Sequence, residues 1–216
     1  MGSGLPFAVL ISGRGSNMRA LAQAAEDGGI NGRVVLVISD RADAAGLIEA
    51  ERRRIPTRLI ESGRGADRAA FGRALTAAIE ESRAELVALA GFMRILDAGF
   101  AARWAGRLLN IHPSLLPAHR GLHTHRRVLE AGDRQHGCTV HFVTAELDAG
   151  PAVIQGRLAV LADDTEETLS ARVQRLEHII YPRAVGWFAA GRLACIEGAV
   201  WLDGRPLAAP VIEDAV

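Results

Sequence analysis

The stretch FAVLISGRGSNM, residues 7–18, places an apolar strand-like run directly before a glycine-rich loop and the start of a helical pattern. Residues 7–11 have the length and apolar continuity of a strand that is buried on both faces. Apolar residues then recur at helical spacing over residues 18–25. A strand that runs through a short glycine loop into a helix is the opening unit of an α/β fold.

Strand-like and helical patterns keep alternating through the first half of the chain. Continuous apolar strands are typical of a mostly parallel, twisted sheet with helices on both faces, so we expect a single-domain, Rossmann-like α/β fold. After Gly137 two strand-like runs follow each other without a helix, which indicates an antiparallel addition to the sheet. The expected strands are 7–11, 34–39, 57–60, 86–90, 107–111, 138–143 and 152–160, and the expected helices are 18–25, 43–53, 67–82 and 97–104.

A long helix and a short hairpin are expected after these elements. Asp164 and Glu167 stand three residues apart, as in a capping box, and predict the start of the helix. Pro182 is expected to kink or end it. Residues 193–202 resemble a short hairpin, and residues 206–216 a loosely held tail. The apolar stripe of the helix comprises Leu169, Val173, Leu176, Ile180 and Val185.

The composition is that of a soluble globular protein, with 49% apolar and 23% charged residues among 216. We expect one domain over residues 1–216, with residues 1–5 disordered or left over from cloning. The 25 basic residues balance the 25 acidic ones. We therefore expect small-molecule substrates, and neither a nucleic acid nor a membrane surface held by bulk charge.

All 25 basic residues are arginines, so the sequence has no lysine. Schiff-base and pyridoxal phosphate enzymes, protein kinases and Walker NTPases each need a lysine amine, and the sequence excludes them. Its two cysteines, Cys138 and Cys195, are too few for a disulfide scaffold and suit the reducing cytoplasm, where we expect the protein. No apolar run approaches the ~18 residues of a membrane span.

The loop SGRGSN predicts an anion site, because its backbone N–H groups and those of the first helical turn point to one spot. A phosphate of mononucleotide size suits the loop, with side-chain hydrogen bonds from Ser16 and Asn17 and a contact from Arg14. Two alternatives stay open. Dinucleotide binding would need a third glycine where Met18 stands and would use Asp40 for the ribose, and a purely structural turn would use Asn17 as a helix cap.

Three polar residues are expected to meet at the carboxyl ends of the later strands. Strand alternation places Asn110 and His112 on one face, and Asp148 follows the 138–143 strand in a turn. An amide and an imidazolium can hold the oxyanion of a tetrahedral intermediate, while a carboxylate keeps the imidazole protonated by raising its pKa. This set predicts acyl transfer without a nucleophilic residue.

Two other chemistries compete for the same region. His119, His123 and His125 lie near one another in sequence and could ligate a metal, although no further Cys, Asp or Glu converges on them. Ser114 could serve as the nucleophile of a hydrolase, but it does not stand on a Gly-x-Ser-x-Gly elbow. We expect no metal.

Motifs along nearly the whole chain resemble one family, the folate-dependent phosphoribosylglycinamide formyltransferases of purine synthesis. These motifs are SGRGSN from Ser12, LAGFMRIL from Leu89, LLNIHPSLLP from Leu108, GLHTH from Gly121, TVHFV from Thr139, LDAGPAVIQ from Leu147 and ARVQRLEHIIYP from Ala171. The resemblance implies transfer of the formyl group of 10-formyltetrahydrofolate, a co-substrate, to the amine of phosphoribosylglycinamide.

The resemblance also implies residue roles. Asn110, His112 and Asp148 would be catalytic, with His112 as proton donor and Asp148 raising its pKa. Gly15, Ser16 and Asn17 would bind the substrate phosphate, Glu177 the ribose and Gly91 the region of the amine. The implied folate contacts are Arg68, Met93, Arg94, Ile95, Leu96, Asn110, Thr144 and Asp148.

Ordinary structural roles remain as alternatives for several of these residues. Glu177 could be a solvated helix carboxylate, Met93 and Leu96 could only pack, and Arg68 could lie on the surface. His141 is expected to be a core or supporting histidine rather than a catalyst. We expect a monomer or a homodimer.

Three rival functions share part of this pattern. A formyltetrahydrofolate hydrolase has the same Asn/His/Asp set but carries a regulatory domain, and a methionyl-tRNA formyltransferase carries a basic tRNA-binding domain. A chain of 216 residues with zero net charge has room for neither. A non-catalytic phosphate-binding module would keep SGRGSN without needing the catalytic set.

Overall fold

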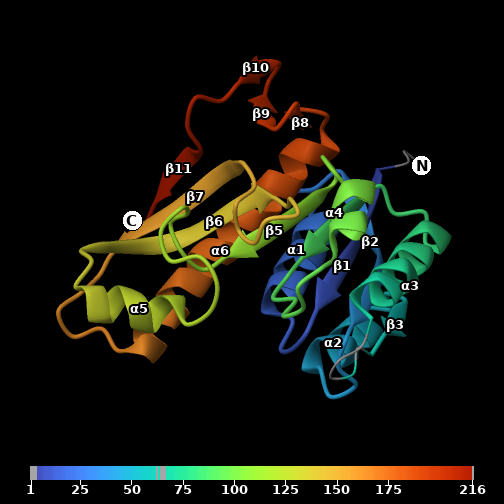
Figure 1. Ribbon diagram of the computed structural model, residues 1–216, viewed down its shortest axis with the longest axis horizontal. Coiled ribbons are helices and arrows are strands. Elements are labelled where there is room, and N and C mark those ends of the chain that lie inside the picture. Colours follow the sequence, from blue (N-terminus) through green and yellow to red (C-terminus); the bar gives the residue numbers. More distant parts are fainter. Residues whose placement is uncertain (1–3, 62, 64–66, 216) are drawn as a thin grey trace.

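An eight-stranded sheet forms the centre of the computed structural model, which describes residues 4–61, 63 and 67–215 (Figure 1). Its strand order is β11-β7-β6-β5-β4-β1-β2-β3, and a separate three-stranded sheet has the order β10-β9-β8. The strands are β1 (Leu5–Ile11), β2 (Gly32–Ser39), β3 (Thr57–Leu59), β4 (Leu86–Leu89), β5 (Leu108–His112), β6 (Gln135–Phe142), β7 (Ala152–Ala159), β8 (Leu193–Ile196), β9 (Ala199–Leu202), β10 (Arg205–Pro206) and β11 (Val211–Asp214). The helices are α1 (Ser16–Glu26), α2 (Ala45–Arg52), α3 (Arg68–Glu81), α4 (Ala98–Arg103), α5 (Thr124–Ala131) and α6 (Glu166–Ala189).

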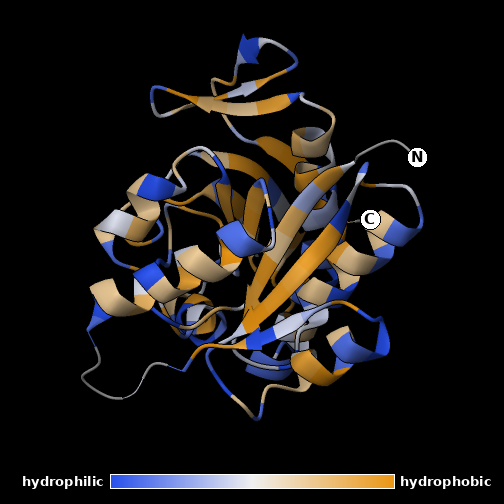
Figure 2. Ribbon diagram, turned by 90° about the vertical axis from the view of Figure 1, so that its right-hand side faces the viewer, coloured by the Kyte–Doolittle hydropathy of each residue, from blue (hydrophilic) through white to orange (hydrophobic). Residues whose placement is uncertain are grey.

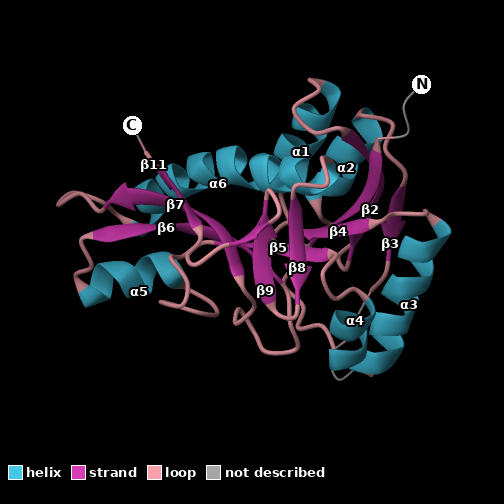
Figure 3. Cartoon of the chain, turned by 90° about the horizontal axis from the view of Figure 1, so that it is seen from above, coloured by secondary structure: helices cyan, strands magenta, loops and turns pink. Residues whose placement is uncertain are grey.

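Successive residues of β1 serve two different cores, one on each face of the sheet. Phe7, Val9 and Ile11 pack with apolar residues of α1 and α6, whereas Ala8 and Leu10 pack with residues of α3 and α4. Figure 3 shows α1, α2 and α6 on one side of the sheet and α3 and α4 on the other. Apolar colour dominates the strands in Figure 2. The doubly covered sheet that the sequence predicts is therefore confirmed.

The parallel part of the sheet runs from β3 to β5, and β6 is antiparallel to both β5 and β7. The predicted antiparallel addition is thus confirmed. The predicted hairpin is also present, because β8 pairs with β9 in antiparallel register.

Several predictions need correction. The capping box of α6 joins Thr165 and Thr168, because Asp164 instead accepts hydrogen bonds from the Leu161 N–H and the Thr168 hydroxyl. The helix does not end at Pro182 but continues to Ala189.

The two chain ends also differ from expectation. Val211–Asp214, expected in a loose tail, forms β11 along β7, where Asp214 pairs with Arg157 at 2.7 Å. Leu5, in the segment expected to be disordered, begins β1; residues 1–3 lie outside the described part. Helix α5 was not predicted. Within the described residues, no helix is long and apolar enough to cross a bilayer.

Candidate active site

A cavity of about 850 Å³ opens where β1, β4 and β5 reach their carboxyl ends. Ligands of open α/β sheets bind at this edge. The lining comes from the segments directly after the three strands, from the segment that leads into α5, from the turn after β6, and from α6. The lining segments are residues 12–17, 90–95, 110–113, 121–125 and 147–148, with Glu166, Ser170, Gln174 and Glu177.

The glycine loop, residues 12–15, joins β1 to α1 and lines the cavity. Gly15 has a φ of +72°, and a Cβ on it would approach the Cα of Gly46 to 2.7 Å, so only glycine fits. The Gly46 N–H donates to the Gly13 carbonyl at 3.0 Å, which fixes the loop against the start of α2. The loop therefore presents the N-terminus of α1, with its unpaired backbone N–H groups, to the cavity.

Helix α6 braces the loop through two side-chain hydrogen bonds. Gln174 Nε2 donates to Ser16 Oγ at 3.1 Å, and Asn17 Nδ2 donates to Glu177 Oε2 at 2.8 Å. The sequence assigned the Asn17 side chain to a phosphate; here its amide faces Glu177, and a phosphate would meet its backbone N–H. Burial raises the pKa of Glu177, and the hydrogen bond from Asn17 acts in the opposite direction. Glu177 is thus buried beside the cavity rather than solvated.

Asn110 and His112 come from β5, and both line the cavity, as the strand alternation predicts. The neighbouring strand β6 places His141 opposite Asn110. His141 Nδ1 donates to the Phe142 carbonyl at 2.9 Å, which leaves Nε2 to accept from Asn110 Nδ2 at 3.1 Å. Burial lowers the pKa of His141, in keeping with this neutral, accepting ring. This contact fixes one N–H of Asn110, whose side chain also lines the cavity.

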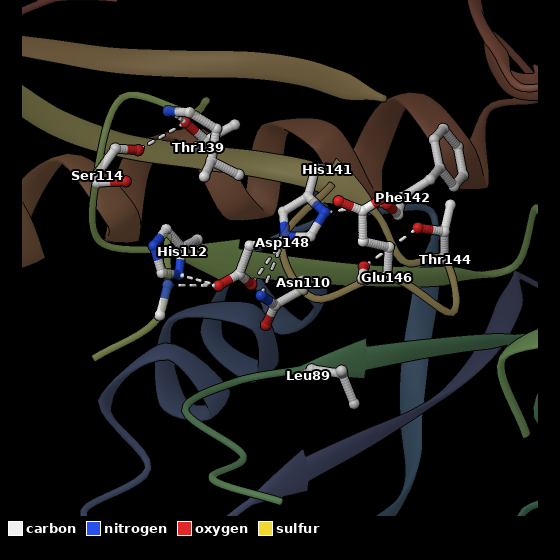
Figure 4. A network of polar contacts seen from close by, with 12 residues as sticks. Leu89, Asn110, His112, Ser114, Thr139, His141, Phe142, Thr144, Glu146 and Asp148 are labelled. Carbon is white, nitrogen blue, oxygen red and sulfur yellow. Dashed lines mark hydrogen bonds and ion pairs between the residues drawn. The ribbon is translucent and has the colours of Figure 1, made fainter. Parts of the chain in front are cut away.

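Asp148 lies between two imidazoles (Figure 4). Its Oδ2 is 3.5 Å from His112 Nδ1, and its Oδ1 is 3.9 Å from His141 Nε2. The Gly121 N–H donates to Oδ2 at 2.9 Å. The side chains of Asp148 and His112 are each only 8% exposed, so their charges are weakly screened. The carboxylate and imidazole that the sequence places together do lie together.

The expected folate residues fall into two groups. Met93, Arg94 and Ile95 line the cavity, and the first and third are exposed there. The segment is held by Ser12 Oγ, which accepts from the Met93 N–H at 2.8 Å. Leu96, Thr144 and Arg68 are not among the described residues of the lining; Leu96 packs on the core, Thr144 Oγ1 donates to the Glu146 carbonyl, and Arg68 is the exposed first residue of α3.

The competing site chemistries find little support in the geometry. Ser114 is fully buried, donates to the Ala118 carbonyl at 2.7 Å and is not part of the described lining, so it is not placed as a nucleophile. Asp40, which a dinucleotide ribose would need, instead accepts from Arg94 Nε at 2.6 Å. In the described part of the chain, no group of three His, Cys, Asp or Glu side chains could hold a metal ion.

Sequence reasoning missed two residues that shape the site. Ser170 and Gln174 line the cavity together with Glu177. Ser170 and Gln174 are four residues apart, and Gln174 and Glu177 are three apart, so all three lie on one face of α6. This polar stripe beside the apolar stripe is the sequence signal that could have identified Ser170 and Gln174 as site residues. The contact of His141 with Asn110 depends on the β5–β6 register, which one sequence does not reveal.

Similarity to known proteins agrees with this fold and site. A family model described as formyl transferase matches residues 5–185, and the chain belongs to that family. Phosphoribosylglycinamide formyltransferase of Escherichia coli (strain K12) is 50% identical over 199 residues, which cover 92% of this chain and 94% of that protein. The chain is thus similar, within the family, to the phosphoribosylglycinamide formyltransferases, and its enzyme class is that of a formyl-group transferase.

Solved structures give the same relationship. Phosphoribosylglycinamide formyltransferase from Coxiella burnetii, in complex with CHES, has a TM-score of 0.93 and 46% identity and covers 98% of this chain and 100% of its own. Glycinamide ribonucleotide transformylase 1 from Symbiobacterium toebii has a TM-score of 0.89 and 43% identity, over 94% and 95% of the two chains. The family resemblance and fold class that the sequence indicates are confirmed.

Proposed function

We propose that the protein transfers the formyl group of 10-formyltetrahydrofolate to the amine of phosphoribosylglycinamide, giving the formylated ribonucleotide and tetrahydrofolate. The observation that carries the proposal is the meeting of Asn110, His112 and Asp148 in one cavity with the glycine loop. The similarity to phosphoribosylglycinamide formyltransferases supports the choice of both substrates.

The ribonucleotide would lie along the loop and α6. Its phosphate would accept hydrogen bonds from the backbone at Gly15, Ser16 and Asn17, where the helix N-terminus favours an anion. Its ribose hydroxyls would meet Glu177, and its amine the region of Gly91. These residues all line the same cavity, which supports a single continuous site for phosphate, ribose and amine.

The folate would occupy the more apolar wall. Met93, Ile95, Leu122 and Leu147 line the cavity and are each more than half exposed there, so they offer apolar surface to a flat ring system. A site with this wall and with the polar set of β5 fits a formyl-carrying folate as co-substrate.

In the reaction, the neutral amine forms a bond to the formyl carbon, and the electrons of the C=O bond move to its oxygen. Asn110 and protonated His112 stabilise this oxyanion by hydrogen bonds aimed at the developing charge. When the intermediate collapses, the bond to N10 of the folate breaks. The amine loses one proton to a solvent relay beside Asp148, N10 gains one from His112, and the relay returns a proton to His112.

His112→Ala tests this assignment. We expect near-complete loss of tetrahydrofolate release when both substrates are present, while titration calorimetry still detects folate binding. Near-normal turnover of the variant would contradict the proposed role of His112. We further propose that the enzyme works in the cytoplasm, which its two free cysteines suit, as a monomer or homodimer.

A further inference from the structure

The loop that follows β5 is bonded at four consecutive residues beside the site. Three backbone carbonyls accept hydrogen bonds from side chains, and the next backbone N–H donates to Asp148. The pairs are Ser114 Oγ to Ala118 O (2.7 Å), His112 Nε2 to His119 O (3.1 Å), Arg127 Nη1 to Arg120 O (2.6 Å) and Gly121 N to Asp148 Oδ2 (2.9 Å). The position of this loop therefore determines where the hydrogen-bond acceptor of His112 Nε2 lies.

His119 is the residue of this loop that contacts His112 directly and is itself anchored. Its φ of +52° is left-handed, and its ring Nε2 lies 2.6 Å from Asp133 Oδ2, just beyond the end of α5. A carboxylate accepts only, so the ring donates to it. The His119–Asp133 pair thus anchors the loop at the same residue whose carbonyl accepts from His112.

The two nitrogens of His112 have different partners. The His119 carbonyl can only accept, so a hydrogen bond at 3.1 Å requires a hydrogen on Nε2. Nδ1 lies 3.5 Å from Asp148, beyond a close hydrogen bond, and that oxygen already accepts from Gly121. When the ring is neutral and holds one hydrogen, the shorter contact favours the Nε2–H tautomer. When the ring is charged, Nε2–H donates to the His119 carbonyl and Nδ1–H faces the Asp148 carboxylate.

Nδ1 is also the nitrogen on the cavity side. Asp148, which faces Nδ1, is part of the cavity lining, whereas His119, which faces Nε2, is not part of the described lining. A proton gained or lost during the reaction would then move at Nδ1, while Nε2–H stays bonded to the loop.

We propose that His119 is a positioning residue: its carbonyl, held by the His119–Asp133 pair, fixes His112 with a hydrogen on Nε2, so that Nδ1 exchanges the reacting proton. The kinetic consequence rests on the proposed formyl transfer. The ring geometry does not, and the two are tested separately.

The test compares the intact protein with His119→Asn and Asp133→Ala, singly and combined. Asparagine tolerates the left-handed backbone of His119 but is too short to keep the bond to Asp133. Glu81→Ala, at the end of α3, removes an exposed ion pair with Arg58 of β3 and serves as control. The ring ¹⁵N resonances of His112, assigned by a His112→Gln spectrum, report its tautomer at alkaline pH, where imidazoles are neutral.

We expect the Nε2–H tautomer in the wild type and in the control, and a tautomer mixture in the variants. We also expect kcat to fall about tenfold or more with KM unchanged for both substrates, because a displaced catalytic ring loses rate rather than binding. The double variant should be no worse than the worse single one. A wild-type Nδ1–H tautomer, or variants with wild-type resonances and kcat, would overturn the inference. Wild-type protein with the Nε2–H tautomer but no formyl transfer would overturn only the proposed function.

Discussion

Asp148→Asn isolates the charge that faces His112. Asp148 has a left-handed φ of +49°, which asparagine also tolerates, and the amide oxygen can still accept from the Gly121 N–H. Unit charges 3.5 Å apart attract by about 5 kcal/mol at an effective dielectric constant near 20. At about 1.4 kcal/mol for each factor of ten, loss of this attraction to an imidazolium in the transition state lowers kcat on the order of a thousandfold.

The assay follows tetrahydrofolate release at saturating concentrations of both substrates, and calorimetry measures binding of each one. Asp43→Asn, which changes an exposed carboxylate paired with Arg41, is the control and should keep wild-type kcat. We expect both dissociation constants of Asp148→Asn to stay within a few-fold of wild type. A kcat within tenfold of wild type would refute the electrostatic role of Asp148. A matching loss of ribonucleotide or folate binding would show that the charge serves binding instead.

Three further predictions concern stability. Because burial raises the pKa of Glu177, the stability that its protonated form contributes is present at low pH and is lost as the pH rises through that raised pKa. In denaturant titrations, Glu177→Gln should therefore stabilise the free protein at neutral pH by on the order of 1 kcal/mol, with no gain below pH 4.5; in kinetic assays, it should raise KM for the ribonucleotide. Burial lowers the pKa of His136 from 6.5 to about 4, so its neutral form stabilises the fold above pH 6.5, and this stability is lost as the pH falls from 6.5 to about 4. Hydrogen exchange in α5, whose His125 contacts His136 at 2.9 Å, should therefore become faster over this pH range, after correction for the intrinsic exchange rate. Protection factors that do not change with pH would contradict this. The Tyr181 hydroxyl lies 3.0 Å from the Leu89 carbonyl and 3.1 Å from the Leu109 carbonyl. Tyr181→Phe removes these hydrogen bonds and should lower Tm by about 2–6 °C in calorimetry. An unchanged Tm would mean that they contribute nothing to stability.

Local patterns predict the first half of the fold well, because each buried parallel strand is a continuous apolar run and each helix has its own period. The later elements depend on distant partners. Strand β11 exists because Val211–Asp214 pairs with β7, and its sequence has no strong strand signal by itself. The start of α6 differs from the prediction because Asp164 bonds to Leu161 and Thr168, which leaves Thr165 as the cap.

The candidate site follows the same division. Asn110 and His112 could be predicted from alternation along one strand, and the loop at Gly15–Asn17 from its place between strand and helix. The contact of Asp148 with His112 required β6 to lie beside β5, which the sequence indicates only as an antiparallel addition. The roles of His141 and His119 depend on cross-strand register and on a backbone carbonyl, and neither is visible in a pattern of side chains.

Arginine in place of lysine agrees with the proposed reaction without being evidence for it. The attacking amine belongs to the substrate, and backbone N–H groups with Ser16 can hold a phosphate. Arg14 lines the same cavity, and its planar guanidinium suits a phosphate or carboxylate. No step of the proposed mechanism calls for a protein amine.

The fate of a ¹³C-labelled formyl group tests the central claim most directly. The wild-type protein, given labelled 10-formyltetrahydrofolate and phosphoribosylglycinamide, should convert the label to the formamide of the ribonucleotide, with one tetrahydrofolate released per formamide formed. Carbon-13 NMR separates this product from free formate. Label that appears as formate, or that stays on the folate while both substrates are bound, would contradict transfer to the glycinamide amine.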